Sequence, residues 1–351
     1  MVFEPVINSH KIKFKLLDKM FSDFYFVSDR VNIFINLDSI LSEFYREDLI
    51  SSFMNLKGYE NIALSSEIMN IAAHYRKYFY TRHKKTTFIY FYYMNKKPKK
   101  NMAVYPDYCK SIIERKNIKG KYEVFNNILK DNLRLLSLLS MYVPQVYFLL
   151  SDGYEPSLVP YNIMNNSICD NIVLTKDPYE YQFVSYPNTY VLRLKYDKSV
   201  LLNRKNLIDY ILKDNKYKPN NYIDGIIYEL ILPYLSCKKR DLKGIKGKGK
   251  VNIIKKIDKL ITNKKFPKFE DLSFNSLYKI LDLDVDYDEI KSLYTITNIS
   301  YQYNRLSKKD KINLEEFLID RYENRTIMQI NSTYYLNNPV QLIELWEGVQ
   351  Y

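Results

Sequence analysis

The first 200 residues contain short, continuous apolar runs separated by longer stretches of mixed polarity. The runs are rich in β-branched and aromatic side chains, which is typical of parallel strands buried on both faces of a sheet. They occupy residues 31–38, 86–94, 145–150 and 171–175. Helical patterns lie between them, near 65–80, 123–141 and 156–164. Strands that alternate with helices predict an α/β fold with a wound, parallel sheet.

The pattern changes after about residue 203, where short amphipathic helical runs such as "NLIDYILK" and "VNIIKKIDKLI" follow one another. A second, mostly helical domain is therefore expected. Since single cores stop growing at roughly 250–300 residues, two domains fit a chain of 351 residues. The predicted division is an N-terminal extension over 1–30, an α/β domain over 31–205 and a helical domain over 206–351.

The charge balance favours an anionic partner. Lys and Arg number 53 against 40 Asp and Glu, a formal net charge of +13, which suits nucleic acid and would also suit an anionic membrane surface. The hydrophobic fraction of 46% excludes a disordered chain. Three widely spaced cysteines indicate neither a disulfide framework nor a zinc site.

The start of the chain does not have the order of a signal peptide, and no apolar run reaches the length of a membrane span. The expected location is therefore the cytoplasm. The abundance of Ile, Asn, Lys and Tyr indicates an AT-rich genome such as that of a virus or phage, for which the location is the host cytoplasm or the virion.

The stretch "RDLKGIKGKGKVNIIKKI", residues 240–257, contains three of the eight glycines of the chain, each flanked by lysine. Two tight turns before an amphipathic helix present backbone N–H groups and a helix N-terminus to a phosphate. Residues 238–265 hold 12 basic residues against two acids. The alternative is a solvated, lysine-rich helix preceded by a flexible loop. The candidate phosphate-binding residues are Gly244, Lys246, Gly247, Lys248, Gly249 and Lys250.

A second basic segment, near 95–120, has no obvious core face and is predicted to be a flexible arch or loop. Its tyrosines Tyr105 and Tyr108 are candidates for stacking on unpaired bases. The neighbouring candidate contacts to phosphate are Lys96, Lys97, Lys99 and Lys100.

Five short motifs, in order, resemble those of the 5′-nuclease family of flap endonucleases and 5′-to-3′ exonucleases, which have a PIN-like core. The resemblance covers about residues 31–260. The motifs are "INLDS", "YPDYCKS", "DGYEPSLVPYNI", "LTKDPYEYQFV" and "GIKGKGK". The last falls where that family carries its helix-hairpin-helix, which is expected here near 236–260.

The resemblance implies a magnesium-dependent phosphodiesterase, because nucleases of that family hold two divalent metals with a carboxylate cluster. On that basis Asp38, Glu155 and Asp177 are the candidate catalytic and metal ligands, and Lys110 is the candidate catalytic cation. At other positions of these motifs, this chain has other residues in place of the metal-ligating acids that the family carries. Those positions carry Ser157, Leu158, Tyr179, Cys237 and Arg240, with Asp241 as a shifted candidate.

Three acids suffice for at most one well-held Mg²⁺. The expected function is therefore binding of nucleic acid, DNA in the first place, through backbone phosphates by a protein with an eroded, inactive metal site. Such a protein would act in viral or phage replication or transcription, with partners from that machinery. The alternatives are an active Mg²⁺-dependent 5′-to-3′ exonuclease or flap endonuclease, and a structural or protein-interaction relic of the fold.

Overall fold

The computed structural model describes residues 11–311 apart from 43–44, 46–48, 52–59, 117–119, 144, 195–197, 238–239 and 246–248. Three candidate residues, Lys246, Gly247 and Lys248, lie outside the described residues. So do the ends of the predicted terminal regions, 1–10 and 312–351.

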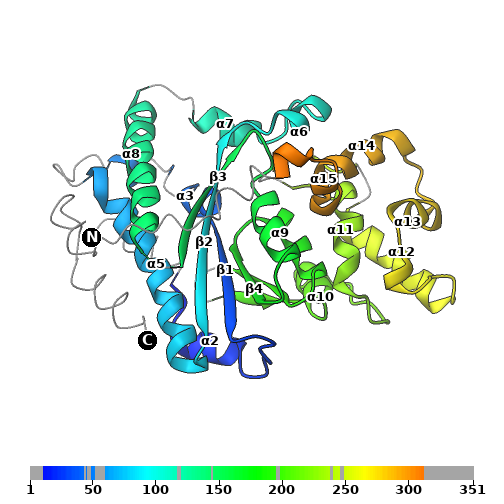
Figure 1. Ribbon diagram of the computed structural model, residues 1–351. Coiled ribbons are helices and arrows are strands. Elements are labelled where there is room, and N and C mark those ends of the chain that lie inside the picture. Colours follow the sequence, from blue (N-terminus) through cyan, green and yellow to red (C-terminus); the bar gives the residue numbers. More distant parts are fainter. Residues whose placement is uncertain are drawn as a thin grey trace.

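A six-stranded sheet forms the centre of the molecule (Figure 1). The strands are β1 (Arg30–Asn36), β2 (Thr86–Lys96), β3 (Val146–Asp152), β4 (Asp170–Thr175), β5 (Thr189–Arg193) and β6 (Val200–Leu202). Their order is β3-β2-β1-β4-β5-β6, and all neighbouring pairs are parallel except β5 and β6. The predicted wound parallel sheet is confirmed.

Helices cover both faces of the sheet, as the apolar character of its strands requires. One face packs against α2 (Phe14–Met20), α5 (Glu60–His83) and α8 (Lys121–Tyr142). α5 and α8 also pack against each other. Within the segment expected to be an extension, Leu17 and Phe21 are buried in this core.

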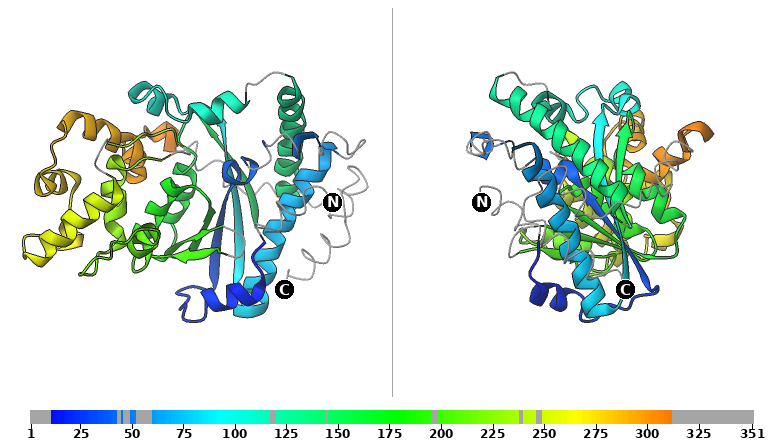
Figure 2. Two further views of the ribbon diagram at one scale, coloured as in Figure 1. Left: turned by 180° about the vertical axis from the view of Figure 1, so that it is seen from behind. Right: turned by 60° about the vertical axis from the view of Figure 1, so that its left-hand side comes forward.

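The opposite face carries the helical part of the chain, which lies on the far side of the sheet from α5 and α8 (Figure 2). Its elements are α9 (Leu158–Asn165), η1 (Pro178–Ser185), α10 (Leu207–Leu212), η2 (Gly225–Ile227), α11 (Tyr228–Ile231), η3 (Leu232–Tyr234), α12 (Lys250–Thr262), η5 (Phe269–Asp271), α13 (Phe274–Leu281), α14 (Tyr287–Thr297) and α15 (Ile299–Asn304). One hydrophobic cluster joins sheet residues such as Phe34 to Ile253, Leu277 and Ile290. The helical part therefore shares a core with the sheet, and the expected boundaries at 30 and 205 stay predictions.

Short helices follow the ends of β1 and β2. They are α3 (Leu37–Leu41), α6 (Lys99–Val104) and α7 (Lys110–Lys116). Among the helices of the described residues, none combines the length and the apolar character needed to cross a bilayer.

Candidate functional site

The three candidate acids follow the carboxyl ends of three parallel strands. Asp38 lies in α3 after β1, Glu155 follows β3, and Asp177 follows β4. The side chain of Asp177 accepts a hydrogen bond from the Tyr179 amide (3.0 Å) and so caps η1. The carboxyl ends of parallel strands meet at one edge, which is where wound sheets bind ligands.

The sheet nevertheless separates these acids into two groups. Tyr92 and Tyr93 are adjacent on β2, so their side chains point to opposite faces. The Tyr92 hydroxyl donates to Glu180 (2.7 Å), on the face that carries Glu155 and Asp177. Tyr93 lines a small cavity on the other face together with Asp38. Asp38 accepts a hydrogen bond from the Met94 amide (2.7 Å).

Arg240 lies between the two acids of the first group. One terminal guanidinium nitrogen is 2.7 Å from Glu155 Oε1, and Nε is 3.3 Å from Asp177 Oδ2. The Nε contact is a charge contact, because its geometry is not that of a hydrogen bond. The side chains are 1% (Arg240), 0% (Glu155) and 4% (Asp177) exposed. We call these three residues the arginine cluster.

Neighbouring side chains complete the surroundings of the arginine cluster. Ser157 donates to Glu180 (2.9 Å) and lies 3.2 Å from Glu155 Oε1. The Tyr108 hydroxyl donates to Glu155 Oε2 (2.6 Å). The guanidinium carbon is 4.9 Å from the centre of the Tyr179 ring. Every carboxylate of this region is thus held by a donor from the chain itself.

The charges in this buried region respond to burial and to each other. Burial raises the pKa of Glu155, and the positive charge of Arg240 opposes that rise. Burial also raises the pKa of Glu180, to about 7, with the charge of Asp177 adding to the rise. Burial alone would lower the pKa of Arg240, but Glu155 and Asp177 raise it well above its ordinary value. Arg240 is therefore a permanent cation.

The arginine cluster does not fit a magnesium ion. Mg²⁺ needs near-octahedral oxygen ligands and keeps several of its waters, whereas Arg240 takes up the space and the charge between Glu155 and Asp177. Within the described part of the chain, no three or more His, Cys, Asp or Glu side chains are grouped so that they could hold a metal. The expectation that Asp38, Glu155 and Asp177 together ligate Mg²⁺ stays a prediction. The binding of Glu155 and Asp177 by Arg240 argues against it.

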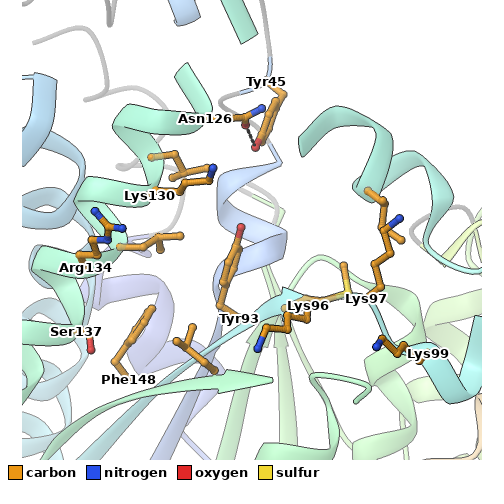
Figure 3. Close-up of a pocket in the computed structure, with 15 residues that line it drawn as sticks. Tyr45, Tyr93, Lys96, Lys97, Lys99, Asn126, Lys130, Arg134, Ser137 and Phe148 are labelled. Atoms are coloured by element: carbon orange, nitrogen blue, oxygen red, sulfur yellow. Dashed lines mark hydrogen bonds between the residues drawn. The ribbon is translucent and has the colours of Figure 1, made fainter. Parts of the chain in front are cut away.

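A basic cavity opens on the face that carries Asp38. It has a volume of about 810 Å³ and lies between α8 and the carboxyl ends of β2 and β3 (Figure 3). Lys130 and Arg134 border it from α8, and Lys96, Lys97 and Lys99 border it from the opposite side. The rest of its lining is largely apolar and aromatic. The aromatic residues are Tyr45, Tyr93 and Phe148.

Some of the predicted contacts in the basic segment lie elsewhere. Lys100 does not line the basic cavity, since its ammonium group pairs with Asp310 (3.3 Å) and lies over the Tyr154 ring. Tyr108 is completely buried and cannot stack on a base, so that expectation is wrong. Tyr105 is partly buried. Lys110 is exposed at the start of α7 and pairs with Asp107 (3.4 Å).

The segment expected to be a flexible arch packs against the rest of the molecule where the structure describes it. Asn101, Tyr108, Cys109 and Ile113 are buried, and α6 packs against α14. The amide of Cys109 donates to the Arg240 carbonyl (3.0 Å). The expectation of a segment without a core face is corrected, because its few apolar residues are the ones that contact the helical part.

The predicted hairpin before α12 begins with a bridge between Cys237 and Leu242. Asp241, the shifted metal candidate, accepts hydrogen bonds from the amide and hydroxyl of Ser111 (2.8 and 2.9 Å) and so caps α7. Gly244 has a φ of +66°, and a Cβ atom there would lie 2.5 Å from the Ser236 backbone nitrogen. Gly244 is therefore required by packing within the chain.

The second described glycine of the hairpin, Gly249, is the N-cap of α12 and has open space around it. Lys250, the first residue of α12, is exposed. The proposed phosphate contacts of this region stay predictions.

Sequence reasoning missed the role of Arg240 and the cavity-lining residues of α8. The motif comparison placed Arg240 where an acid is expected but gave it no function. Lys130 and Arg134 carried a usable signal, because basic residues four apart lie on the same side of a helix.

The comparisons with known proteins concern the fold. No protein-family model matches the chain, and no curated protein matches its sequence. Among solved structures, it is similar to a bacteriophage T5 flap endonuclease, described as a pseudo-enzyme–product complex with DNA and metal ions. The TM-score is 0.49 at 10% identity, over 91% of this chain and 100% of that chain.

It is also similar to a T5 5′-exonuclease with bound zinc ions, with a TM-score of 0.42 at 12% identity, over 91% of this chain and 98% of that chain. At TM-scores below 0.5, these likenesses assign neither a family nor a site to this chain.

Proposed function

We propose that this protein binds nucleic acid, DNA in the first place, and holds an unpaired strand in the basic cavity without hydrolysing it. The observation that carries the proposal is the combination of five cationic side chains with aromatic side chains in one cavity of about 810 Å³. This volume is within the range of about 300–1,000 Å³ that is usual for ligand sites.

The arrangement of the cavity suits a sugar-phosphate chain with exposed bases. Cations on two opposite sides, Lys130 and Arg134 against Lys96, Lys97 and Lys99, can contact successive phosphates. Phe148, which is only partly buried, offers a ring for stacking, which tolerates any base, whereas Tyr93 is 7% exposed and contributes to the wall of the cavity. Paired bases hide their faces, so this chemistry favours a single strand over a duplex.

We propose that the protein does not hydrolyse DNA because other groups of the chain already bind the candidate acids. Two-metal hydrolysis needs several carboxylates to neutralise a combined charge of +4. Asp38 borders a small cavity next to the basic cavity and accepts a hydrogen bond from the Met94 amide, and Glu155 and Asp177 are held by Arg240. This arrangement supports a binding protein over the alternative of an active nuclease.

Binding is tested with a fluorescent single-stranded oligonucleotide and the double variant Lys130→Ala/Arg134→Ala. Both positions are exposed on α8, and alanine favours helix, so the fold should persist. If the two side chains contact phosphates, affinity falls and the slope of log K against log salt decreases by about 1.4.

A matched control removes the same charge elsewhere. Lys15→Ala/Lys19→Ala changes two exposed lysines of α2, at the opposite end of the strands (Figure 1). Equal effects of the two double variants would mean that only net charge matters, and the cavity proposal would fail. Unchanged affinity in both would place the binding of DNA outside the basic cavity, and a wild-type protein without affinity for DNA would favour the structural or protein-interaction alternative.

Hydrolysis is tested separately with a 5′-flap substrate and Mg²⁺ or Mn²⁺. The expected result is no product at any enzyme concentration. Cleavage that disappears in Asp177→Ala would establish the nuclease alternative. A role in viral or phage replication or transcription, with partners from that machinery in the host cytoplasm, remains part of the proposal.

A further inference from the structure

Arg240 connects four parts of the chain that are distant in sequence. Its guanidinium reaches Glu155 after β3 and Asp177 after β4, and lies 3.8 Å from the Cys109 sulfur at the start of α7. Its own backbone belongs to the turn between Cys237 and Leu242. The arginine cluster is thus a junction between two strand ends, α7 and the hairpin before α12.

The charges of this junction are arranged as they are around a bound metal ion. Two strand-end carboxylates converge on one cation that is 1% exposed, and their remaining oxygens accept further hydrogen bonds. The second oxygen of Glu155 accepts from Tyr108, and Oδ1 of Asp177 accepts from the Tyr179 amide. A cation supplied by the chain itself needs no ion from solution.

We infer that Arg240 is the built-in counter-ion of Glu155 and Asp177, so that this centre takes no divalent metal, and that truncation of Arg240 creates a cation site there. The inference deepens the non-catalytic part of the proposed function and does not depend on the binding of DNA. A fork of parallel N–H donors makes arginine suited to such a place, since one side chain can reach carboxylates on two sides.

The wild-type protein provides the first test. Its thermal midpoint should be the same in millimolar Mn²⁺, in millimolar Mg²⁺ and in EDTA, and direct titration with Mn²⁺ should show no binding that depends on Glu155. Mn²⁺ binding by the wild type that is lost in Glu155→Gln or Asp177→Asn would overturn the inference.

The variant Arg240→Ala provides the second test. Two carboxylates then face a space without a counter-ion, and the thermal midpoint in EDTA should fall well below that of the wild type. Mn²⁺ at about 100 times its dissociation constant should raise the midpoint of this variant by about 4 °C. The rise should disappear when Asp177→Asn is added. A folded Arg240→Ala protein without a response to Mn²⁺ would contradict the inference.

Two further variants test whether the positive charge of Arg240 or the shape of its guanidinium group matters. Arg240→Lys retains a cation but not the fork, so it should be less stable than the wild type and insensitive to Mn²⁺. Arg82→Ala removes an exposed arginine from α5, outside the basic cavity, and should behave like the wild type with the metal. If Arg240→Ala does not fold, the wild-type titration with Glu155→Gln still decides whether this centre binds a divalent ion.

Failure of this inference can be distinguished from failure of the proposed function. A protein that binds Mn²⁺ through Glu155 and also binds single strands would refute only the built-in counter-ion. A protein that binds neither Mn²⁺ nor DNA would refute only the proposal that it binds nucleic acid.

Discussion

Tyr108 has a structural role at the residue scale, although it lies in a basic segment. Its hydroxyl donates to the buried carboxylate of Glu155, and its side chain has no exposed surface. Tyr108→Phe should lower the free energy of unfolding by about 1–3 kcal/mol, because a buried, charged acceptor loses its partner. The affinity for single strands should not change. Chemical denaturation and an oligonucleotide titration measure the two quantities.

Tyr105, which is partly buried, provides the comparison for Tyr108. Tyr105→Phe keeps the ring and removes only a hydroxyl, so stability should change by less than about 0.5 kcal/mol. A loss of DNA affinity in Tyr108→Phe at full stability would restore the stacking role that burial argues against.

Gly244 combines a left-handed backbone with close contact to the chain. Gly244→Ser should destabilise the protein by more than the roughly 1–2 kcal/mol that a side chain costs at positive φ, because its Cβ would also clash with the backbone at Leu235 and Ser236. Gly249→Ser is the matched control. That position has open space and is an N-cap, where serine is favoured. Equal losses of stability in urea denaturation would contradict this explanation.

The role of Arg240 could not be predicted from the sequence. Its partners lie 85 and 63 positions away, at Glu155 and Asp177, and only the folded sheet brings them together. The motif comparison located both acids correctly at strand ends. A motif comparison shows that an acid is missing at position 240. It does not show that the arginine there binds two acids, because those acids are far away in the sequence.

At the element scale, α12 holds the preceding segment through a single buried acid. Asp258 is 3% exposed and accepts hydrogen bonds from the Tyr217 hydroxyl (2.6 Å) and from the amides of Asn220 (2.9 Å) and Asn221 (3.0 Å). Burial would raise the pKa of Asp258, but these donors outweigh it and lower the pKa below its ordinary value.

The lowered pKa fixes the sign of the pH dependence. The unfolded chain binds the proton more readily than the folded one, so the contribution of Asp258 is complete above its unfolded pKa of about 3.9 and is lost as the pH falls through the folded value. Asp258→Ala should cost about 3 kcal/mol at neutral pH, and the difference from the wild type should shrink below about pH 4. Chemical denaturation of both proteins from pH 2.5 to 7 would measure this difference in stability and its change with pH.

Hydrogen exchange locates the effect of that change. The amides of Asn220 and Asn221 should exchange faster in Asp258→Ala, because they lose their acceptor. Asp214→Ala, at an exposed position just after α10, should leave both amides unaffected. If the difference in stability between the wild type and Asp258→Ala stays constant down to pH 2.5, the pH dependence does not come from Asp258.

The long elements were predictable because periodicity and burial agree in them. The runs at 86–94 and 171–175 correspond to β2 and β4, and the stretch at 123–141 corresponds to α8. The short strands β5 and β6 gave no clear pattern, since three to five residues cannot show a period. The packing of α6 and α7 was missed because a few buried residues in a lysine-rich segment do not outweigh its polarity.

At the scale of the whole molecule, one core on each side of the sheet joins the parts that sequence patterns separated. The change of periodicity near residue 203 is real, but the helices that follow extend the core on one face of the sheet. Composition could predict an anionic partner from the net charge of +13. It could not locate the proposed binding surface, because the cationic residues of the cavity come from separate segments.

Two basic surfaces should therefore recognise different forms of DNA. The basic cavity suits an unpaired strand, and the hairpin before α12 is predicted to contact duplex phosphates through Lys246, Lys248 and Lys250. Replacing these three lysines by alanine should lower the salt slope for a duplex by about 2.7 and affect a single strand less. Lys130→Ala/Arg134→Ala should show the opposite preference. Fluorescence anisotropy over a range of salt concentrations, with both ligands and all variants, measures each slope.

A substrate that joins a duplex to a single-stranded tail tests whether the surfaces act together. If one molecule of DNA spans both, the combined variant should lose the sum of the two slope changes on this substrate, because contacts to different phosphates release separate counterions. The same loss on a plain duplex would mean that the cavity lysines and arginine contact paired DNA. A combined loss no larger than that of either variant alone would show that the two surfaces bind DNA in alternative modes.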